Sequence, residues 1–508
     1  MSAKILSAAI VGLDSDLVEV EADVGHSPSA FVIVGLPDKA VEESKERIRS
    51  AMKNSGLEFP RPKVTVNLAP ADVKKEGPSY DLPIAVAVLA TGDAFAWHRE
   101  DRDALFVGEL SLDGHLRPIA GALAISLLAQ RRGLKRIFLP EANAGEANLV
   151  PGLEIVPIET LTQLVLHLAG ERRIEPLRFN SLQPPENTEY AFDMAYIQGQ
   201  EHAKRALEIA AAGGHNILLI GPPGSGKTLL ARTLPSILPT LTLEEALEVT
   251  RLYSVSGMLS QQSQPLIWER PFRSPHHTAS GVAIVGGGTT PRPGEISLAH
   301  RGILFMDEFP EFSRAVLENL RQPLEDGVVS VSRASGSIQF PAKFMLVGSM
   351  NPCPCGYATD PSRHCLCTFA QVLKYRKRIS GPMLDRIDIH VEVPRLQFEK
   401  LADTAVAESS VSVRARVEKA RQVQYERFRN EGILTNAEMG SRVVRKFCEV
   451  DEGGLTLLKN AVASMKLSAR GYYRVLKIAR TIADLAGEEK ITTQHIGEAI
   501  QYRPKVGE

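Results

Sequence analysis

The pattern of apolar and polar positions predicts an α/β protein whose C-terminal part is helical. Residues 31–34 and 64–68 are short apolar runs typical of strands. The charged stretch 38–54 between them has the spacing of an amphipathic helix. A later unit repeats the order strand, helix, strand over residues 104–108, 121–130 and 136–139.

The same pattern divides the chain into three parts. Residues 1–170 alternate strands and helices, whereas residues 171–190 lose periodicity and contain Pro184 and Pro185, as expected of a linker. A second alternating part covers residues 191–395, and residues 396–508 have a helical pattern throughout. The helices that we expect there cover residues 411–430, 441–450, 454–465, 471–486 and 493–502.

A glycine-rich run in the second part predicts nucleotide binding. Residues 221–228 fit G-x-x-x-x-G-K-[ST], an apolar strand precedes them, and helical character resumes after them. Backbone N–H groups of such a loop surround phosphates, and the following helix adds the partial positive charge of its N-terminus. Lys227 is expected to reach the β- and γ-phosphates of ATP, and Thr228 to hold Mg²⁺. The predicted binding residues are Gly221, Pro222, Pro223, Gly224, Ser225, Gly226, Lys227 and Thr228.

Two later strands end in side chains suited to hydrolysis. Residues 302–306 are apolar and run into Asp307 and Glu308. Asp307 would orient Mg²⁺ and its waters, and Glu308 would polarise the attacking water. The next apolar strand leads to Asn351, which we expect near the γ-phosphate; taken alone, Asn351 is equally consistent with a turn before a proline.

Composition excludes some classes of protein. The 508 residues carry a net charge of −1, so any affinity for nucleic acid must come from local patches. No apolar run reaches the roughly 18 residues that a membrane span needs, and no signal-peptide pattern follows Met1. With only five cysteines, we expect a cytoplasmic protein whose clustered thiols bind metal rather than form disulfides.

Four thiols lie within residues 353–367. Four thiolates satisfy a tetrahedral Zn²⁺ site, although the C-x-C spacing of both pairs is tighter than the usual C-x₂-C. His364 is a spare ligand, and unliganded thiols on an insertion loop are the alternative. The predicted zinc ligands are Cys353, Cys355, Cys365 and Cys367, while Cys448 stands alone in a predicted helix as a core residue.

These motifs resemble those of AAA+ ATPases of the magnesium-chelatase type, and among them the ComM/YifB competence-protein group. Further strings that carry the resemblance over essentially the whole chain are residues 197–200, 271–278, 286–300, 351–356 and 381–388. The resemblance implies a three-layer α/β AAA+ domain followed by a helical lid, assembled as a hexamer with ATP between subunits. Asn351 then falls at the sensor-1 position and Arg386 at the arginine finger. Arg470 is the expected sensor 2, with Arg474 as its rival.

Two features of this part leave alternatives open. Arg386 could instead form a salt bridge with Asp385 or Asp388. His276 and His277 could bind a metal, but adjacent histidines usually point apart, which favours a structural role in their loop.

The first part is similar to the proteolytic domain of Lon-type proteases over residues 77–79 and 108–121. Those enzymes use a serine–lysine dyad. Ser79 matches the nucleophile, but Leu123 occupies the lysine position, and Tyr80 and Asp81 replace the Ala-Gly that follows the serine. We therefore expect a non-proteolytic α+β domain.

A basic hairpin is the expected DNA contact. Residues 328–332 and 337–340 have the pattern of two short strands joined by a turn, with Arg333 near the tip. Copies of Arg333 around a ring would line its channel with positive charge. A second basic run contributes Lys374, Arg376, Lys377 and Arg378, although both sets could be ordinary solvated surface.

Three functions are consistent with the sequence. A hexameric DNA helicase that promotes branch migration in natural transformation or recombination fits the resemblance best. A chelatase-like ATPase that remodels protein partners is the alternative. An ATP-dependent protease is disfavoured because Leu123 replaces the lysine.

Overall fold

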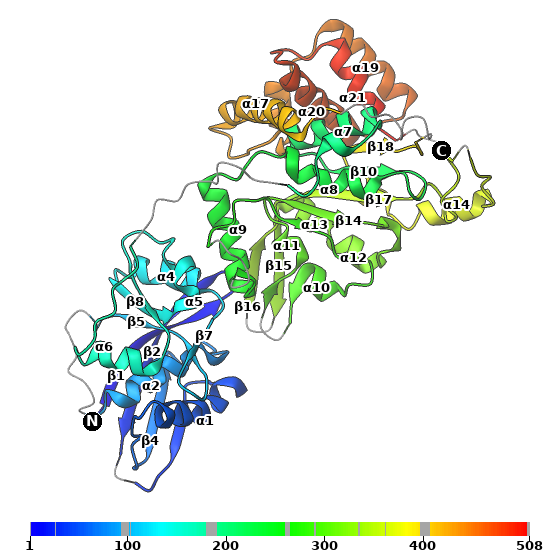
Figure 1. The fold of residues 1–508 in the computed structure, drawn as a ribbon. Helices are drawn as coiled ribbons and strands as arrows, with labels where there is room; N and C mark the ends of the chain where they lie inside the picture. The colour runs from blue at the N-terminus through cyan, green and yellow to red at the C-terminus, as the bar shows by residue number, and fades with distance from the viewer. Residues whose placement is uncertain are drawn as a thin grey trace.

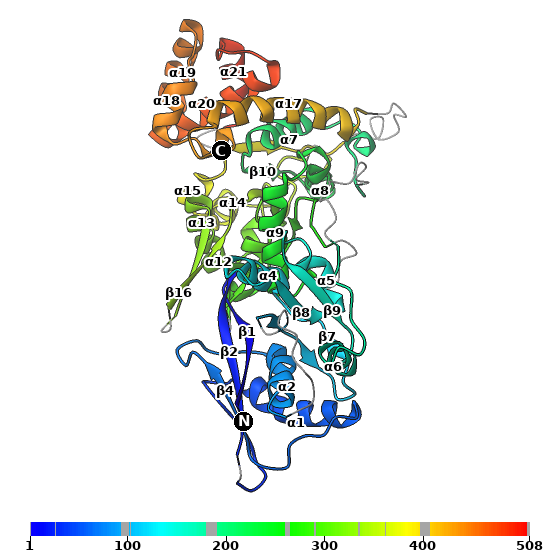
Figure 2. The ribbon, with the colours of Figure 1, turned by 90° about the vertical axis from the view of Figure 1, so that its left-hand side faces the viewer.

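The protein consists of three bodies arranged in line, with the helical C-terminal body and the N-terminal body at opposite ends (Figures 1 and 2). Within the described part of the chain, no helix combines the length and apolar character that crossing a bilayer requires. The predicted linker lies largely outside the described residues. The computed structural model describes residues 2–25, 27–92, 101, 103–178, 190–259, 265–288, 291–333, 336–360, 362–396 and 407–504.

The N-terminal body is built on a seven-stranded sheet of order β3-β4-β2-β1-β5-β8-β9. Its longest strands, β1 (Ser2–Val11) and β2 (Asp14–Val24), form an antiparallel hairpin. Helix α2 (Asp81–Leu89) is buried along its whole length. The other elements are β3 (Phe31–Val34), α1 (Lys39–Asn54), β4 (Val64–Ala69), β5 (Leu105–Phe106), β6 (Glu109–Leu110), β7 (Leu116–Arg117), α4 (Ala122–Arg131), β8 (Arg136–Pro140), α5 (Glu141–Ala147), β9 (Glu154–Ile158) and α6 (Leu161–Leu168).

The central body is a parallel five-stranded sheet of order β11-β14-β17-β10-β18. The predicted α/β fold class is confirmed. Because all five strands are parallel, the loops that follow them meet at one edge, which places the site there. The strands are β10 (Ile217–Ile220), β11 (Phe272–Arg273), β14 (Ile303–Met306), β17 (Met345–Met350) and β18 (Ile389–Glu392). The helices are α7 (Glu201–Gly213), α8 (Lys227–Ile237), α9 (Leu243–Ser256), α10 (Gly281–Val285), α11 (Glu295–Leu298), α12 (Arg314–Asn319), α13 (Arg321–Asp326), α14 (Phe369–Arg376) and α15 (Gly381–Leu384).

Two hairpins project from the central body. The predicted basic hairpin is confirmed as β15 (Val328–Arg333) paired antiparallel with β16 (Gly336–Pro341). It points away from the helical body in both views (Figures 1 and 2). The smaller hairpin pairs β12 (Gly286–Gly287) with β13 (Arg292–Pro293).

Helix α9 joins the central body to the N-terminal body. Its apolar side shares one buried cluster with α4 and β5, to which Leu252 and Leu123 both belong. Arg251 donates to the carbonyl of Leu13 over 2.9 Å, and the N–H of Gly121 donates to the carbonyl of Ser254 over 2.8 Å. Burial of a shared apolar core stabilises the contact between the two bodies.

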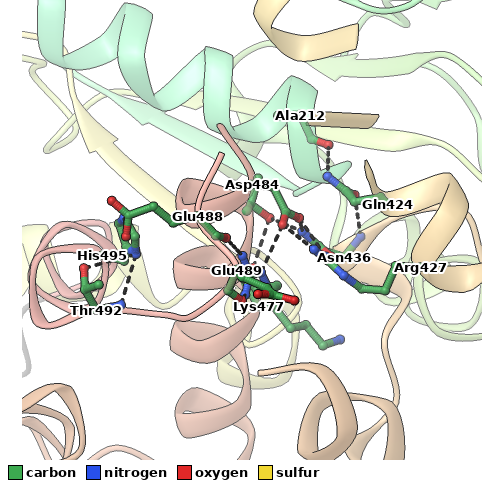
Figure 3. A network of polar contacts seen from close by, with 12 residues as sticks. Ala212, Gln424, Arg427, Asn436, Lys477, Asp484, Glu488, Glu489, Thr492 and His495 are labelled. Carbon is green, nitrogen blue, oxygen red and sulfur yellow. Dashed lines mark hydrogen bonds and ion pairs between the residues drawn. The ribbon is translucent and has the colours of Figure 1, made fainter. Parts of the chain in front are cut away.

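The C-terminal body consists of helices, as predicted, and shares the buried cluster that covers one face of the central sheet. A polar network fixes it from within (Figure 3). Gln424 donates to the carbonyl of Ala212 on α7 and accepts from the backbone of Asn436, whose side chain donates to Asp484. Arg427 also pairs with Asp484. The helices are α17 (Ser410–Phe428), α18 (Ser441–Phe447), α19 (Glu452–Ser464), α20 (Ala469–Ala486) and α21 (Thr493–Gln501).

Candidate nucleotide-binding site

The predicted phosphate loop connects β10 to α8 at the carboxyl edge of the central sheet. The first position of the loop requires a glycine because the backbone of Val393 lies close to it. A Cβ on Gly221 would lie 2.1 Å from the carbonyl oxygen of Val393. Gln200 braces the loop by donating to the carbonyls of Pro394 over 2.6 Å and Ser225 over 3.4 Å. The loop and the first residues of α8 line one cavity.

This phosphate-loop cavity has a volume of about 440 Å³ and brings most of the predicted ATP-site residues together. Lys227 is buried, and its ammonium donates to the carbonyls of Gly221 and Pro222 over 2.7 and 2.9 Å. Burial lowers the pKa of Lys227, an effect that the charge of Asp307 opposes. The cavity is lined by Pro223, Gly224, Ser225, Gly226, Lys227, Thr228, Leu229, Asp307, Glu308, Ser349, Met350 and Asn351.

Oxygen ligands suited to Mg²⁺ lie side by side in the cavity. The hydroxyl of Thr228 donates to Asp307 Oδ2 over 3.0 Å, and Ser349 donates to the other carboxylate oxygen. Hydroxyl and carboxylate oxygens are the ligands that Mg²⁺ accepts beside phosphate. Thr228 and Asp307 thus fit the predicted metal, with Asp307 held in place from the neighbouring strand β17.

Asn351 follows β17 and faces the phosphate loop. Its Oδ1 lies 3.4 Å from Lys227 Nζ. Glu308 follows β14, and its side chain, which is 58% exposed, lines the same cavity. The two side chains predicted to contact the γ-phosphate and the attacking water therefore lie on the same side of the loop as Lys227.

The four clustered cysteines lie directly beyond Asn351. Their sulfur atoms all lie within 4.8 Å of one another, and three of the separations are 3.3, 3.6 and 3.7 Å. Tetrahedral thiolates around zinc would stand about 3.8 Å apart, given Zn–S bonds of about 2.3 Å. The backbone N–H of Tyr357 lowers the pKa of Cys355 to about 6, which favours its thiolate. The group fits a metal ion, and its members are Cys353, Cys355, Cys365 and Cys367.

The cysteine loop contacts the phosphate loop. A Cβ on Gly356, whose φ is +88°, would lie 2.7 Å from Pro223 Cδ. The segment that carries the thiols is therefore packed against the loop that would hold ATP. His364 is exposed and is not part of the cysteine group, while Cys448 is buried one residue beyond the end of α18 rather than within the helix.

Arg386, Arg470 and Arg474 lie together in a different cavity, of about 470 Å³. Arg386 pairs with Glu325 on α13 and with the carbonyl of Pro382, so the alternative salt bridges to Asp385 and Asp388 are not formed. Burial lowers the pKa of Arg386, and the charge of Glu325 opposes this effect. We call this space the arginine cavity; none of the phosphate-loop residues lines it.

The two candidates for sensor 2 differ in their surroundings. Arg470 is 65% exposed and lies 4.0 Å from Glu325, whereas Arg474 is 12% exposed. Arg474 lies 3.3 Å from Asp388, whose carboxylate also lies 3.2 Å from His215. Burial alone would raise the pKa of Asp388, but the hydrogen bond and charge of His215 and the charge of Arg474 lower it to about 2. Arg474 thus has a structural task that Arg470 lacks.

Comparison with known proteins identifies the family. Models of the magnesium chelatase subunit ChlI match residues 193–401, 20–143 and, for the C-terminal part of that subunit, 407–503. The competence protein ComM of Haemophilus influenzae is 42% identical over 99% of this chain and 97% of its own length. The chain belongs to the ComM/YifB group of magnesium-chelatase-type AAA+ proteins.

Two further relatives match different lengths of the chain. The uncharacterised protein YifB of Escherichia coli is 43% identical over 97% of this chain and 96% of its own length. A Lon protease of Azorhizobium caulinodans is 29% identical over 32% of this chain and 20% of its own length. The predicted resemblance to the ComM/YifB group is confirmed, and a partial resemblance to Lon proteases accompanies it.

The other predicted residues do not line the phosphate-loop cavity. Arg333 pairs with Gly336 at the end of the hairpin, and its side chain lies outside the described part of the structure. The basic run lies on and just after α14; Lys374, Lys377 and Arg378 are exposed, and Arg378 pairs with Glu311. In the N-terminal body, Leu123 is buried in the apolar cluster shared with α9, whereas Ser79 is half-buried.

The structure adds two contacts that the sequence analysis missed. His277 Nδ1 lies 3.5 Å from Glu308 Oε2, and Glu325 pairs with Arg386. The adjacency of β11 and β14 in the parallel sheet could have suggested the first, because His277 and Glu308 each follow one of these strands. No sequence pattern pointed to Glu325. Among the described residues, the cysteines form the one group of metal-ligating type, so His276 and His277 are not part of such a group.

Proposed function

We propose that the chain is an ATP-driven DNA motor, a homo-hexameric helicase that promotes branch migration in natural transformation or recombination. One observation carries the assembly: the phosphate-loop cavity and the arginine cavity are lined by different residues of one chain. A second copy that presents its arginine cavity to the phosphate loop would complete a hydrolytic site. The competence protein ComM, similar over nearly the full length, supports the biological setting.

ATP hydrolysis follows from the residues of the phosphate-loop cavity. Lys227 would exchange its backbone carbonyl partners for the β- and γ-phosphates, and Thr228 and Asp307 would hold Mg²⁺, which neutralises phosphate charge. Glu308 would accept a proton from the attacking water, and Asn351 would orient that water or the γ-phosphate. Arg386 of a neighbouring copy would stabilise the charge that develops in the transition state.

DNA would contact the hairpin β15–β16. Arg333 ends β15 at the hairpin's far end, and Val331 and Ile338 pack against the buried cluster shared with the N-terminal body. The hairpin is therefore anchored at its middle. A cationic tip repeated around a ring would bind the phosphate backbone without sequence preference. The exposed Lys374 and Lys377, with Arg376 and Arg378, would extend this surface.

We further propose that the cysteine group holds one Zn²⁺. Three of the sulfur separations are close to those of a tetrahedral site, and Cys353 is fully buried. Such an ion would fix the loop that follows Asn351. Metal analysis should find about one zinc per chain. Cys365→Ser should lose the metal, whereas Cys448→Ala, which removes a thiol elsewhere, should retain it; a parent chain without zinc would contradict the proposal.

Nucleotide hydrolysis measured with and without single-stranded and forked DNA tests the motor. We expect DNA to stimulate hydrolysis and forked DNA to be unwound, both steeply weakened by added salt because phosphate contacts release counterions. Arg333→Ala should lower stimulation and unwinding. Lys490→Ala removes a positive charge from the surface of the helical body and should change neither. Unwinding by Arg333→Ala at the parental rate would contradict the hairpin's role, and hydrolysis indifferent to DNA would contradict the motor.

A further inference from the structure

Two residues from different strand ends meet at the rim of the phosphate-loop cavity. Strand β11 runs parallel to β14, with Phe272 opposite Ile303 and Arg273 opposite Leu304. The segments that leave these strands therefore emerge side by side. His277 on the first segment and Glu308 on the second are the side chains that meet, with 3.5 Å between Nδ1 and Oε2.

The Glu308 carboxylate needs a partner to be held in one place. The backbone of Glu308 lies in the left-handed region, at φ 52° and ψ 47°, a conformation that few non-glycine residues adopt. The backbone N–H of Glu308 donates to Asp307 Oδ1 over 3.1 Å. The side chain itself is 58% exposed and long, so its rotamers remain free unless a neighbour selects one. Within the described residues, His277 is the one ion-pairing partner of the Glu308 carboxylate.

His277 is itself held by aromatic packing. Its ring contacts that of His276 at a tilt of 33°, with 4.2 Å between centroids, and it meets the buried Phe312 edge-on at 6.4 Å and 82°. Phe312 is 3% exposed, so it belongs to the fixed interior of the central body. The imidazole thus has a defined place from which Nδ1 can act on Glu308.

We propose that His277 is a positioning residue that orients the Glu308 carboxylate toward the phosphate-loop cavity. The inference rests on the proposed ATPase function and assigns to His277 a task within that site. A general base must stand within hydrogen-bonding reach of its water, and small displacements of such a group lower the rate strongly. Because His277 contacts Glu308 rather than the cavity itself, its loss should affect turnover and leave nucleotide binding unchanged.

The position of His277 also connects the site with the neighbouring insertion. Ser280 caps α10 by accepting from the N–H of Ala283 over 3.2 Å, and α10 continues into hairpin β12–β13. Three residues separate His277 from the start of this unit. The chain thus runs from His277 directly into α10 and the hairpin that follows it.

Steady-state ATP hydrolysis by the full chain tests the proposal. His277→Phe keeps an aromatic ring against Phe312 and removes the nitrogen that lies beside Glu308; we expect kcat to fall about tenfold while KM for ATP changes less than about twofold. His277→Asn carries an amide nitrogen near the position of Nδ1 and should recover most of the loss. His115→Asn is the matched control, because it removes an exposed imidazole that lies 3.3 Å from the carboxylate of Asp113 in the N-terminal body, and it should hydrolyse ATP at the parental rate.

Each outcome of these measurements either supports or contradicts the proposed role of His277. A selective fall of kcat in His277→Phe, rescued in His277→Asn, supports the assignment. Equal kcat in the parent and both His277 variants overturns it, and so does a rise of kcat, which would mean that the contact restrains Glu308 instead of orienting it. A parent chain that does not hydrolyse ATP, or whose hydrolysis survives Glu308→Gln, would contradict the proposed function and this inference with it.

Discussion

The phosphate-loop cavity and the arginine cavity use positive charge in opposite ways. In the first, Lys227 is a single ammonium held by two backbone carbonyls, Gly221 and Pro222. In the second, Arg386 is paired with a carboxylate, that of Glu325, and stands near the further guanidiniums of Arg470 and Arg474. Backbone carbonyls yield to a phosphate without leaving a charge behind, whereas a displaced carboxylate must find another partner.

This difference has a consequence for when each cation can act. Lys227 needs only nucleotide to exchange its partners. In the proposed assembly, Arg386 would need both a nucleotide with its γ-phosphate and a neighbouring copy that brings that phosphate near, because only then would a partner better than Glu325 be present. The arrangement predicts that binding belongs to one chain and that hydrolysis belongs to a pair of chains. The following experiments test that separation.

The largest effect should come from Lys227→Ala. A buried cation contributes charge-assisted hydrogen bonds to phosphate, so we expect ATP affinity to fall by about 100-fold and hydrolysis to disappear. Binding of a fluorescent ATP analogue to the separated monomer measures the first effect. The monomer of the parent chain should bind the analogue, and failure to do so would contradict the idea that one chain supplies the whole binding site.

Arg386→Ala should separate binding from turnover. Removal of a transition-state guanidinium lowers kcat by about a thousandfold or more in related phosphoryl transfers, whereas affinity should change less than about threefold. Mixing this variant with Lys227→Ala sharpens the test, because some neighbouring pairs then combine an intact phosphate loop with an intact Arg386. Hydrolysis restored in the mixture supports the shared site, and a mixture as inactive as its components contradicts it.

Arg470→Ala and Arg474→Ala should differ in kind. Arg470 is exposed beside Glu325, so its loss should lower kcat by about tenfold and leave the melting temperature unchanged. Loss of Arg474 removes one of the cations beside the buried Asp388 and leaves His215 and Lys477 facing it, which should destabilise the fold by up to about 3 kcal/mol. Thermal unfolding and kinetics of both variants decide between them. A normal melting temperature for Arg474→Ala together with lost turnover would make Arg474 the sensor.

The contiguous parts of the site could be predicted from the sequence because each follows a strand of one parallel sheet. The phosphate loop, Asp307 and Asn351 come directly after β10, β14 and β17, so their strings alone place them at one edge. Helix boundaries in the C-terminal part were likewise predicted to within a few residues. The long hairpin β1–β2 was missed, since its strands mix apolar and charged residues.

Contacts between distant segments could not be predicted in the same way. Arg386 and Glu325 are 61 residues apart, and nothing in either local pattern selects the other. The separate position of the arginine cavity likewise depends on how α13, α15 and α20 pack, which is tertiary information. The role of Arg333 in DNA binding stays a prediction, because its side chain lies outside the described part of the structure.

The smallest expected effect is a pH dependence of stability that arises from His390 on β18, the strand that follows Arg386 and Asp388. His390 on β18 is buried, and burial together with the charge of Arg503 lowers its pKa to about 3. An unfolded histidine titrates near pH 6.5, so the unfolded chain binds more protons than the folded one between these values. The free energy of unfolding should therefore keep its full value above about pH 6.5 and fall by up to about 1.4 kcal/mol per pH unit below it.

Chemical denaturation at pH 7.5 and 5.5 measures this loss. His390→Asn keeps an uncharged polar side chain that cannot take up the proton, so its stability should fall less between the two pH values than that of the parent. Asp388, with its pKa near 2, stays ionised throughout this range and adds nothing to the difference. An identical pH dependence in the parent and in His390→Asn would contradict the assignment of the acid sensitivity to His390.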